Sequence, residues 1–296
     1  SSDPADGTAA ADPYLTVNLH FTAPVDLRAA PRYLSIQPSV SALHVDVGDQ
    51  NTLTINGNFK PSTGYRVTVR AGLPSMLGDR LPATRVISFQ TAAYKAALNL
   101  IGAGSLNTYD AYRPLHLYAN VTNVSKVTVN LYRQSESQFL RFIAPGFDRS
   151  HYSPAGLPLV SSFSQEIHMA LNKTTTVEVL TLHGTPAGPL PAGYYVAAAS
   201  APEAGSVQYL PLLITRSALT LKAGDNQALV WATDLRNGAP LANLPVRVVD
   251  AAGNLVLSGR TAADGVYSGV VARGRHLAYQ TLRALLDRPG DVAIVG

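Results

Sequence analysis

Cysteine is absent from this sequence of 296 residues, charged residues make up only 14% of it, and there is a single tryptophan. The missing cysteines exclude disulfide bonds, thiolate zinc sites, iron–sulfur clusters, cysteine nucleophiles and an internal thioester from this stretch of chain. Hydrophobic residues make up 46% of the chain. That fraction is enough for the buried cores of about two or three domains, which is the number that the length suggests.

Long hydrophobic runs are also missing. The longest apolar stretches, such as 194–199 and 210–214, have the length of a strand. A membrane helix needs about 20 apolar residues. Residues 1–12 have neither an apolar stretch nor a basic start, so they do not form a signal peptide, and we predict a flexible N-terminus there.

The net charge of +4 is spread evenly along the chain. Basic and acidic residues number 7 and 7 up to residue 93, 8 and 6 from residue 94 to 216, and 8 and 6 after that. A nucleic-acid or anionic-membrane partner would require a clustered basic face. The charge pattern therefore predicts no nucleic-acid partner.

Hydrophobic residues alternate with polar ones through most of the chain. Leu15, Val17, Leu19 and Phe21 begin this pattern, and it recurs at 53–55, 65–69, 86–89, 115–121 and 127–132, with further strands predicted at 207–215 and 227–233. The runs are short and are separated by Gly, Pro, Asn and Asp clusters at intervals of about 8–12 residues, which is typical of sandwiches. We predict an all-β fold of tandem antiparallel β-sandwich domains.

The turn clusters divide the predicted strands into three domains with tight linkers. They cover residues 13–93, 94–216 and 217–296, and we expect the third to be a truncated sandwich because Gly296 directly follows a strand. The best helical candidate is Tyr279 to Leu286, and its flanks fit a strand equally well. These linkers favour a stiff string of modules.

One segment of the second domain does not follow the strand pattern. Residues 134–173 contain an aromatic-rich stretch at 139–152 and no regular alternation. A structureless loop of that length is uncommon in a compact domain, so we expect part strand and part insertion. Packing against its own or a neighbouring domain is favoured over a ligand site, because large exposed apolar patches are rare.

No pattern of catalytic, cofactor-binding or metal-ligating residues is present. The histidines have no close pairs, there is no Gly-x-Ser-x-Gly string, and the acidic residues are scattered. The Gly-rich run at 102–105 lacks the Lys and Ser or Thr of a phosphate loop, and it reads as a loop. The seven histidines are His20, His44, His116, His151, His168, His183 and His276. We expect no enzyme activity and no small-molecule cofactor.

In the third domain, the clearest local signals are residue pairs typical of tight turns. Asn237-Gly238 and Asp264-Gly265 are two-residue hairpin signals, because such pairs readily adopt positive φ. Pro240 stiffens the connection that follows the first pair. We predict that these residues are structural.

The third domain resembles a known family. Residues 231–248 (WATDLRNGAPLANLPVRV), with 250–255 and 261–267 after them, are similar to the repeated pattern of macroglobulin-like domains in bacterial alpha-2-macroglobulins. The first domain, through 21–26, 53–59 and 65–69, looks like the immunoglobulin-like unit near the start of the same proteins. The resemblance covers nearly the whole chain.

Members of this family trap proteases: a bait segment is cleaved, the molecule rearranges, and a Cys–Gln thioester reacts with the attacking protease. A chain without cysteine cannot hold that thioester, and no bait segment is recognisable. The resemblance therefore implies a non-enzymatic framework fragment of an exported protein, periplasmic, membrane-anchored or extracellular, with any anchor outside this sequence. Its partners would be the remaining domains of the parent chain and, in the full-length protein, target proteases.

Two other functions fit the same residues. The chain could be a surface stalk or adhesin of immunoglobulin-like modules that binds a ligand through the middle domain. Less favoured is a carbohydrate-binding or hydrolytic module that uses the aromatic residues of 139–152. Further macroglobulin-like units and a thioester string in the parent gene would distinguish the first function from these alternatives.

Overall fold

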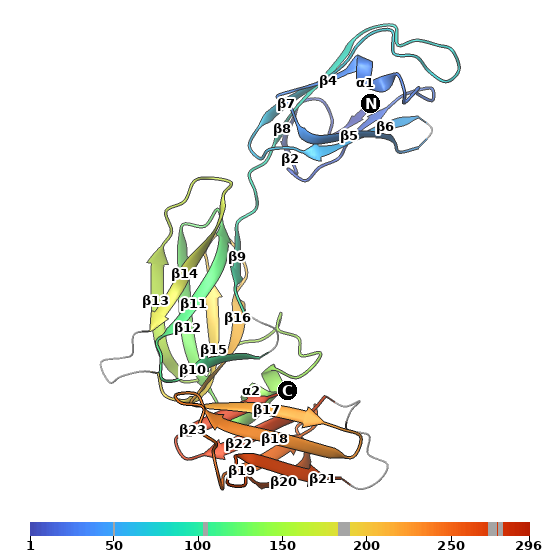
Figure 1. Ribbon diagram of the computed structural model, residues 1–296. Coiled ribbons are helices and arrows are strands. Elements are labelled where there is room, and N and C mark those ends of the chain that lie inside the picture. The colour runs from blue at the N-terminus through green and yellow to red at the C-terminus, as the bar shows by residue number, and fades with distance from the viewer. Residues whose placement is uncertain (50, 103–105, 183–189, 272–276, 278–280) are drawn as a thin grey trace. The chain divides into compact units, whose positions relative to one another are not determined.

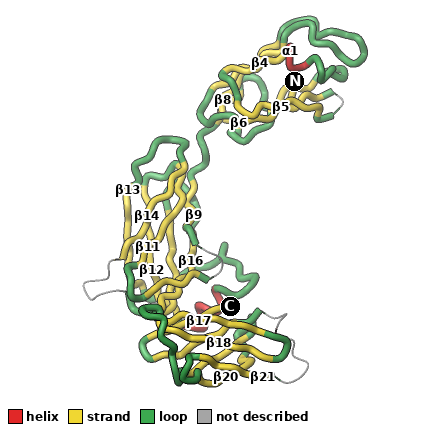
Figure 2. The backbone as a smooth tube through the Cα atoms, in the orientation of Figure 1, coloured by secondary structure: helices red, strands yellow, loops and turns green. Residues whose placement is uncertain are grey.

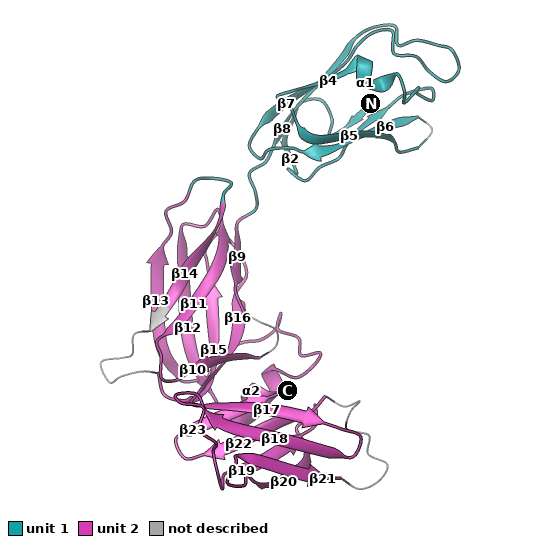
Figure 3. Cartoon of the chain, in the orientation of Figure 1, with its two compact units in different colours: residues 1–95, 170–173 teal, residues 96–169, 174–296 magenta. Residues whose placement is uncertain are grey.

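The computed structural model describes residues 1–296 except 50, 103–105, 183–189, 272–276 and 278–280. The chain forms two compact units (Figure 3). Unit 1 comprises residues 1–95 with 170–173, and unit 2 comprises 96–169 with 174–296. Strands dominate both, and the two helices among the described residues are short (Figure 2). The prediction of an all-β fold is confirmed.

Unit 1 contains two four-stranded sheets with one apolar core between them. The strand orders are β1-β3-β6-β5 and β2-β8-β7-β4. Phe59, Tyr65 and Phe89 form the aromatic centre of this core, with ring centroids 5.0 to 6.0 Å apart. The elements are β1 (Ser2–Asp3), β2 (Thr8–Ala11), β3 (Val17–His20), α1 (Ala30–Tyr33), β4 (Leu34–Gln37), β5 (Ser41–Val47), β6 (Thr52–Asn58), β7 (Gly64–Val69) and β8 (Arg85–Thr91).

The first twelve residues differ from the flexible N-terminus expected for them. Strand β1 pairs with β3, and β2 pairs in parallel with β8. The Gly7 amide donates to the Ser88 carbonyl at 2.7 Å, and the Ser88 amide donates to Asp6 Oδ1 at 2.7 Å. Backbone pairing with a sheet edge depends little on side-chain type, so the composition of this segment did not indicate it.

Unit 2 begins with a sandwich of a five-stranded and a three-stranded sheet (Figure 1). Their orders are β10-β16-β15-β12-β13 and β14-β11-β9. All pairs are antiparallel except β10 with β16, which run parallel along the edge of the larger sheet. Its strands are β9 (Ala97–Leu100), β10 (Asn107–Asp110), β11 (Leu115–Thr122), β12 (Lys126–Gln134), β13 (Leu159–Glu166), β14 (Thr174–Leu182), β15 (Gly193–Ser200) and β16 (Gln208–Thr215).

The segment 134–173 contains a helix that the periodicity did not reveal. Helix α2 spans Glu136–Phe142 between β12 and β13. Ser135 caps it, because its side chain accepts from the Gln138 amide while the Gln138 side chain accepts from the Ser135 amide. Seven residues make fewer than two and a half helical turns, too few for a periodic pattern to emerge.

The last part of unit 2 forms a second sandwich. A sheet in the order β17-β18-β21 faces one in the order β20-β19-β22-β23, and residues of both contribute to one buried apolar cluster. Residues 283–286 of the ambiguous segment 279–286 lie in a strand, while 279 and 280 fall outside the described residues. The strands are β17 (Ser217–Ala223), β18 (Gln227–Asp234), β19 (Pro245–Val249), β20 (Leu255–Arg260), β21 (Val266–Val270), β22 (Arg283–Arg288) and β23 (Asp291–Val295).

The two predicted turns connect strands of different sheets and are not hairpins. Asn237-Gly238 follows β18, whose partners are β17 and β21, and the chain then passes to β19 in the opposite sheet. Asp264-Gly265 likewise joins β20 to β21 across the sandwich. A two-residue hairpin signal fixes local φ values but does not determine which strand pairs with which.

At both turns the glycine adopts a positive φ, and the preceding Asn or Asp side chain accepts a backbone hydrogen bond. Gly238 and Gly265 have φ of 71° and 78°. Asn237 Oδ1 accepts from the Ala239 amide at 3.0 Å, and Asp264 Oδ1 accepts from the Val266 amide at 2.9 Å. Pro240 forms an isolated bridge with Thr233.

No helix in the described part of the chain is long and apolar enough to cross a membrane.

The environment of Gly265 generates a stability prediction. A Cβ at this position would lie 2.5 Å from the Ala232 carbonyl oxygen, in addition to the strain of a positive φ. We expect Gly265→Ala to lower the free energy of unfolding by about 2–4 kcal/mol. The fluorescence of Trp231, the only tryptophan, reports the unfolding of this sandwich in urea.

Gly253→Ala is the matched control, because Gly253 also has a positive φ of 87° but no atom within 4 Å of the added Cβ. This control should lose only about 1 kcal/mol. Equal losses for the two variants would show that the close approach at Gly265 is not important.

Candidate functional site

Side chains from distant segments interact where the two sandwiches of unit 2 meet. We call it the joint. Helix α2 supplies Phe139 and Phe142, which are essentially inaccessible to solvent. The buried residues of this apolar cluster are Phe139, Phe142, Ile143, Tyr194, Val196, Leu213, Val249, Leu285 and Ile294. Of these, the last three belong to β19, β22 and β23 of the second sandwich, and the others to the first.

The helix therefore acts as a spacer whose apolar face fills the space between two sheets. The ring of Phe139 lies 5.1 Å from that of Tyr194 on β15. Truncation of a buried phenylalanine to alanine typically costs about 3–5 kcal/mol, so each ring is a substantial part of the contact. The aromatic residues of 139–142 are thus used in packing, as the favoured interpretation of this segment predicted.

An ion cluster flanks the apolar contact. Arg247 on β19 donates from both terminal nitrogens to Glu136 at the start of α2, at 3.0 and 2.9 Å, and it also contacts Asp287 at 3.0 and 3.1 Å. The Tyr194 hydroxyl donates to Glu136 at 3.3 Å. Arg247 and Glu136 side chains are each 32% exposed, so this bidentate pair is partly shielded from water.

These contacts raise the pKa values of Arg247 and Tyr194. The hydrogen bonds to Glu136 and Asp287 raise the pKa of Arg247 well above its ordinary value. Burial, followed by the nearby Glu136 charge, raises the pKa of the Tyr194 hydroxyl well above 10.0. Tyr194 is therefore a neutral hydrogen-bond donor at neutral pH.

The end of α2 is also attached to the second sandwich. Arg283 on β22 donates from Nη2 to the Ile143 carbonyl at 2.9 Å, and this contact is buried. A cation suits this position, because the last carbonyls of a helix lack partners and carry partial negative charge. Burial lowers the pKa of Arg283, but the group remains a cation near neutral pH.

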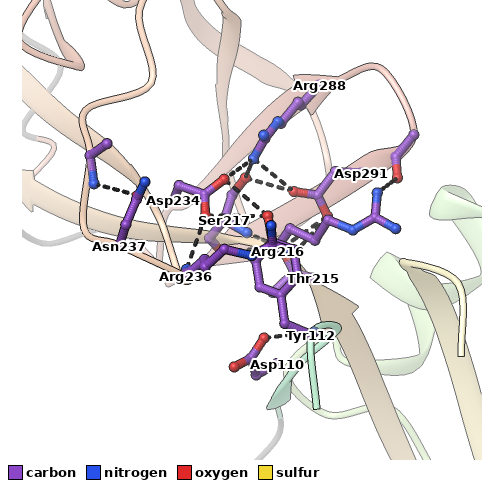
Figure 4. A network of polar contacts seen from close by, with 12 residues as sticks. Asp110, Tyr112, Thr215, Arg216, Ser217, Asp234, Arg236, Asn237, Arg288 and Asp291 are labelled. Atoms are coloured by element: carbon purple, nitrogen blue, oxygen red, sulfur yellow. Dashed lines mark hydrogen bonds and ion pairs between the residues drawn. The ribbon is translucent and has the colours of Figure 1, made fainter. Parts of the chain in front are cut away.

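A second polar group forms around Asp291, whose side chain is only 1% exposed (Figure 4). Its carboxylate accepts from the Ser217 hydroxyl at 2.6 Å, from the Arg216 amide at 2.8 Å and from the Thr215 hydroxyl at 3.3 Å. Arg288 lies 3.9 Å away. Three donors and a nearby cation compensate for the burial of this charge, and they attach the connection between β16 and β17 to β23.

Asp234 extends the same group toward the first sandwich (Figure 4). It receives hydrogen bonds from the Tyr112 hydroxyl at 3.1 and 3.2 Å and from Arg288 Nη1 at 2.9 Å. The guanidinium of Arg236 lies 4.2 Å from the centre of the Tyr112 ring. Tyr112 belongs to the first sandwich and Asp234 to the second, so this is another direct connection across the joint.

The described residues contain no group of three or more His, Asp or Glu side chains placed to hold a metal ion. Within that part of the chain the histidines face solvent or carboxylates. His44 contacts Asp46, His116 contacts Glu178 and His151 contacts Asp148, while His183 and His276 fall outside the described residues. The interactions at the joint are apolar packing and charge pairing between the two sandwiches.

Sequence reasoning favoured packing by the aromatic residues of 139–152, but it did not single out the polar residues of the joint. One available signal was Ser135-x-x-Gln138 before an apolar run, which is typical of a helix N-terminus. The partners Glu136 and Arg247 lie 111 positions apart, and no local pattern connects residues at that separation.

Comparisons with known proteins agree with this architecture. A family model described as a bacterial Ig-like domain matches residues 1–91. Among curated proteins, nothing matches. One similar solved structure is native alpha-2-macroglobulin from Escherichia coli spanning domains MG0-NIE-MG1, at 17% identity and a TM-score of 0.58, with 96% of this chain and 92% of that chain covered.

A second is Salmonella alpha-2-macroglobulin reacted with methylamine, at 16% identity and a TM-score of 0.73. The match covers 97% of this chain but only 18% of that one. Identities this low show the fold alone. The chain therefore has the fold of macroglobulin-like domains, and it spans less than a fifth of the length of the Salmonella protein.

The ion cluster at the joint generates a double-mutant prediction. Alanine substitutions of Glu136 and Arg247, singly and together, should give a coupling energy of about 1–2 kcal/mol, because the pair is bidentate and partly shielded. Urea unfolding followed by circular dichroism measures it.

The matched control is the pair of Lys126 and Glu166, which lie 3.4 Å apart on adjacent strands and are more exposed. Its coupling should be about 0.5 kcal/mol or less. A Glu136–Arg247 coupling no larger than that of the control would contradict a stabilising role at the joint.

Asp234 generates a prediction about pH. Burial raises its pKa, but hydrogen bonds from the Arg236 amide, Arg288 and Tyr112 outweigh burial, and the net pKa lies below 3.8. A pKa lower in the folded than in the unfolded chain gives stability that is complete above 3.8 and lost as the pH falls through the folded value.

Asp234→Asn should therefore reduce the loss of stability as the pH falls below 3.8, and Tyr112→Phe should reduce it less. Urea midpoints from Trp231 fluorescence at several pH values measure this difference. An Asn variant with the full wild-type pH dependence would rule out the contribution.

Proposed function

We propose that this chain is a non-enzymatic framework segment of a bacterial alpha-2-macroglobulin-like protein that traps proteases. The observation that carries the proposal is the fold match over 96% of this chain and 92% of the E. coli fragment. In this proposal the protein is exported, and it is periplasmic, membrane-anchored or extracellular with its anchor outside the chain. Its partners are the other domains of the parent protein and, through them, target proteases.

The joint suits a mechanical role. A trap must rearrange after cleavage, and that rearrangement is useful only if some parts move as rigid bodies. The apolar cluster and two polar groups fix one sandwich of unit 2 to the other, so unit 2 would transmit force without bending. In the same proposal residues 13–93, 94–216 and 217–296 are the three modules, and covalent chemistry belongs to segments beyond this cysteine-free chain.

A surface stalk or adhesin is the second candidate. The bacterial Ig-like match over residues 1–91 favours it, because modules of that class serve many surface proteins. A stiff joint would be equally useful in a stalk, so the two candidates must be separated by activity.

The test compares the parent protein with this chain. We expect the parent to form a complex with an added protease that persists through gel filtration, and to protect the protease from a large substrate but not from a small one. The isolated chain of 296 residues should do neither.

A parent carrying Phe139→Ala and Phe142→Ala should trap less protease, whereas Phe163→Ala, on the exposed strand β13, should leave trapping unchanged. A parent protein that never retains a protease would overturn the trap, and binding of intact parent to a surface ligand instead would favour the stalk.

A further inference from the structure

A cavity of about 500 Å³ lies beside the joint, between the end of β12, helix α2 and the loop that follows it. Gln134, Gln138, Arg141, Phe147 and Tyr152 are among its lining residues. The ion clusters of the joint use none of these side chains. The cavity is large enough for one bulky side chain and the backbone around it.

A buried acceptor without a partner lines this cavity. Gln134 is 6% exposed, its Nε2 donates to the Tyr152 hydroxyl at 3.0 Å, and its Oε1 has no hydrogen-bond partner among the described residues. An unpaired buried acceptor typically costs about 1–3 kcal/mol. A ligand that brings an N–H or O–H to Gln134 Oε1 would remove that cost.

An unpaired cation lies at the same cavity. Arg141, in the last turn of α2, is exposed and forms no ion pair with any described residue. Glu136 is paired with Arg247, and Asp148, which also lines the cavity, accepts hydrogen bonds from Ser150 and His151. Hydrogen bonds from Ser150 and His151 lower the pKa of Asp148 to about 2. Arg141 is thus available to bind a carboxylate.

The apolar wall favours an amino-acid side chain over a sugar. The ring of Tyr152 meets that of Phe142 edge-on, with centroids 4.6 Å apart and planes at 76°, and Phe142 itself is only 1% exposed. The Phe147 ring centroid lies 5.4 Å from that of Phe142 and 6.1 Å from that of Tyr152. A sugar would stack on an open, flat ring face, and the buried ring of Phe142 offers none.

The geometry points to a binding site for the carboxyl-terminal end of a polypeptide with an apolar last residue. Arg141 binds the terminal carboxylate, the rings of Phe147 and Tyr152 enclose the last side chain, and Gln134 Oε1 accepts from a backbone amide of the peptide. This inference does not depend on the trapping function, because it concerns a cavity within unit 2 alone.

The test uses the whole chain and a defined peptide pair. N-acetyl-Gly-Ala-Phe with a free carboxylate should bind saturably in calorimetry or NMR titration, and the same peptide with an amidated end should bind about tenfold more weakly or not at all. Equal binding of the two peptides, binding of neither, or tighter binding of a neutral methyl glycoside would overturn the proposal.

Two variants locate the binding. Arg141→Gln should weaken binding of the free-carboxylate peptide about tenfold, whereas Arg85→Gln, an exposed arginine of unit 1, should leave it unchanged. Gln134→Leu should also weaken binding while its urea midpoint stays the same or rises, because the variant removes the unpaired acceptor. A purely structural Gln134 would instead give a lower midpoint with unchanged affinity, which would contradict the site.

Discussion

The architecture of unit 2 depends on the burial of one face of a seven-residue helix. An isolated helix of that length is not stable in water. Helix α2 is therefore stable only because Phe139 and Phe142 are buried between the two sandwiches. Each sandwich in turn exposes apolar side chains at its end, such as Leu213 and Ile294, that water would cover if the helix were absent. Helix and sandwiches therefore stabilise one another, and neither half of the contact is complete alone.

Polar groups decide how the two sandwiches are oriented within that contact. Apolar packing is non-directional and tolerates small rotations, whereas bidentate and multiply donated hydrogen bonds do not. Arg247 fixes the helix start, Arg283 fixes its end, and Asp291 fixes the interdomain connection. These three anchors attach three different segments of unit 2, so a rotation of one sandwich against the other would strain hydrogen bonds at more than one place.

The sequence predicted the fold class well and the site poorly, for physical reasons. Alternation along a strand such as Leu115–Thr122 directly records that one face is buried, so strands could be found from neighbours in the sequence. Several contacts of the joint pair residues more than a hundred positions apart, such as Glu136 with Arg247 and Ile143 with Arg283, and no local pattern marks these residues. The turns at Gly238 and Gly265 were predicted in part. The residue types predicted the positive φ values, but the sheet that the chain enters after each turn depends on the packing of the whole sandwich.

The connection between the two sandwiches of unit 2 is a single residue, Arg216, between Thr215 of β16 and Ser217 of β17. The Arg216 amide donates to Asp291, and the guanidinium donates to the Gly290 carbonyl at 3.3 Å. Both ends of this residue are therefore fixed in position. Because side chains alternate along a strand, one added residue here would turn Leu219 and Leu221 away from their core while leaving every hydrogen-bonding group in place. The packing of β17 therefore constrains the length of this connection, whereas its two strands could be joined by residues of many types only at the cost of the guanidinium contact.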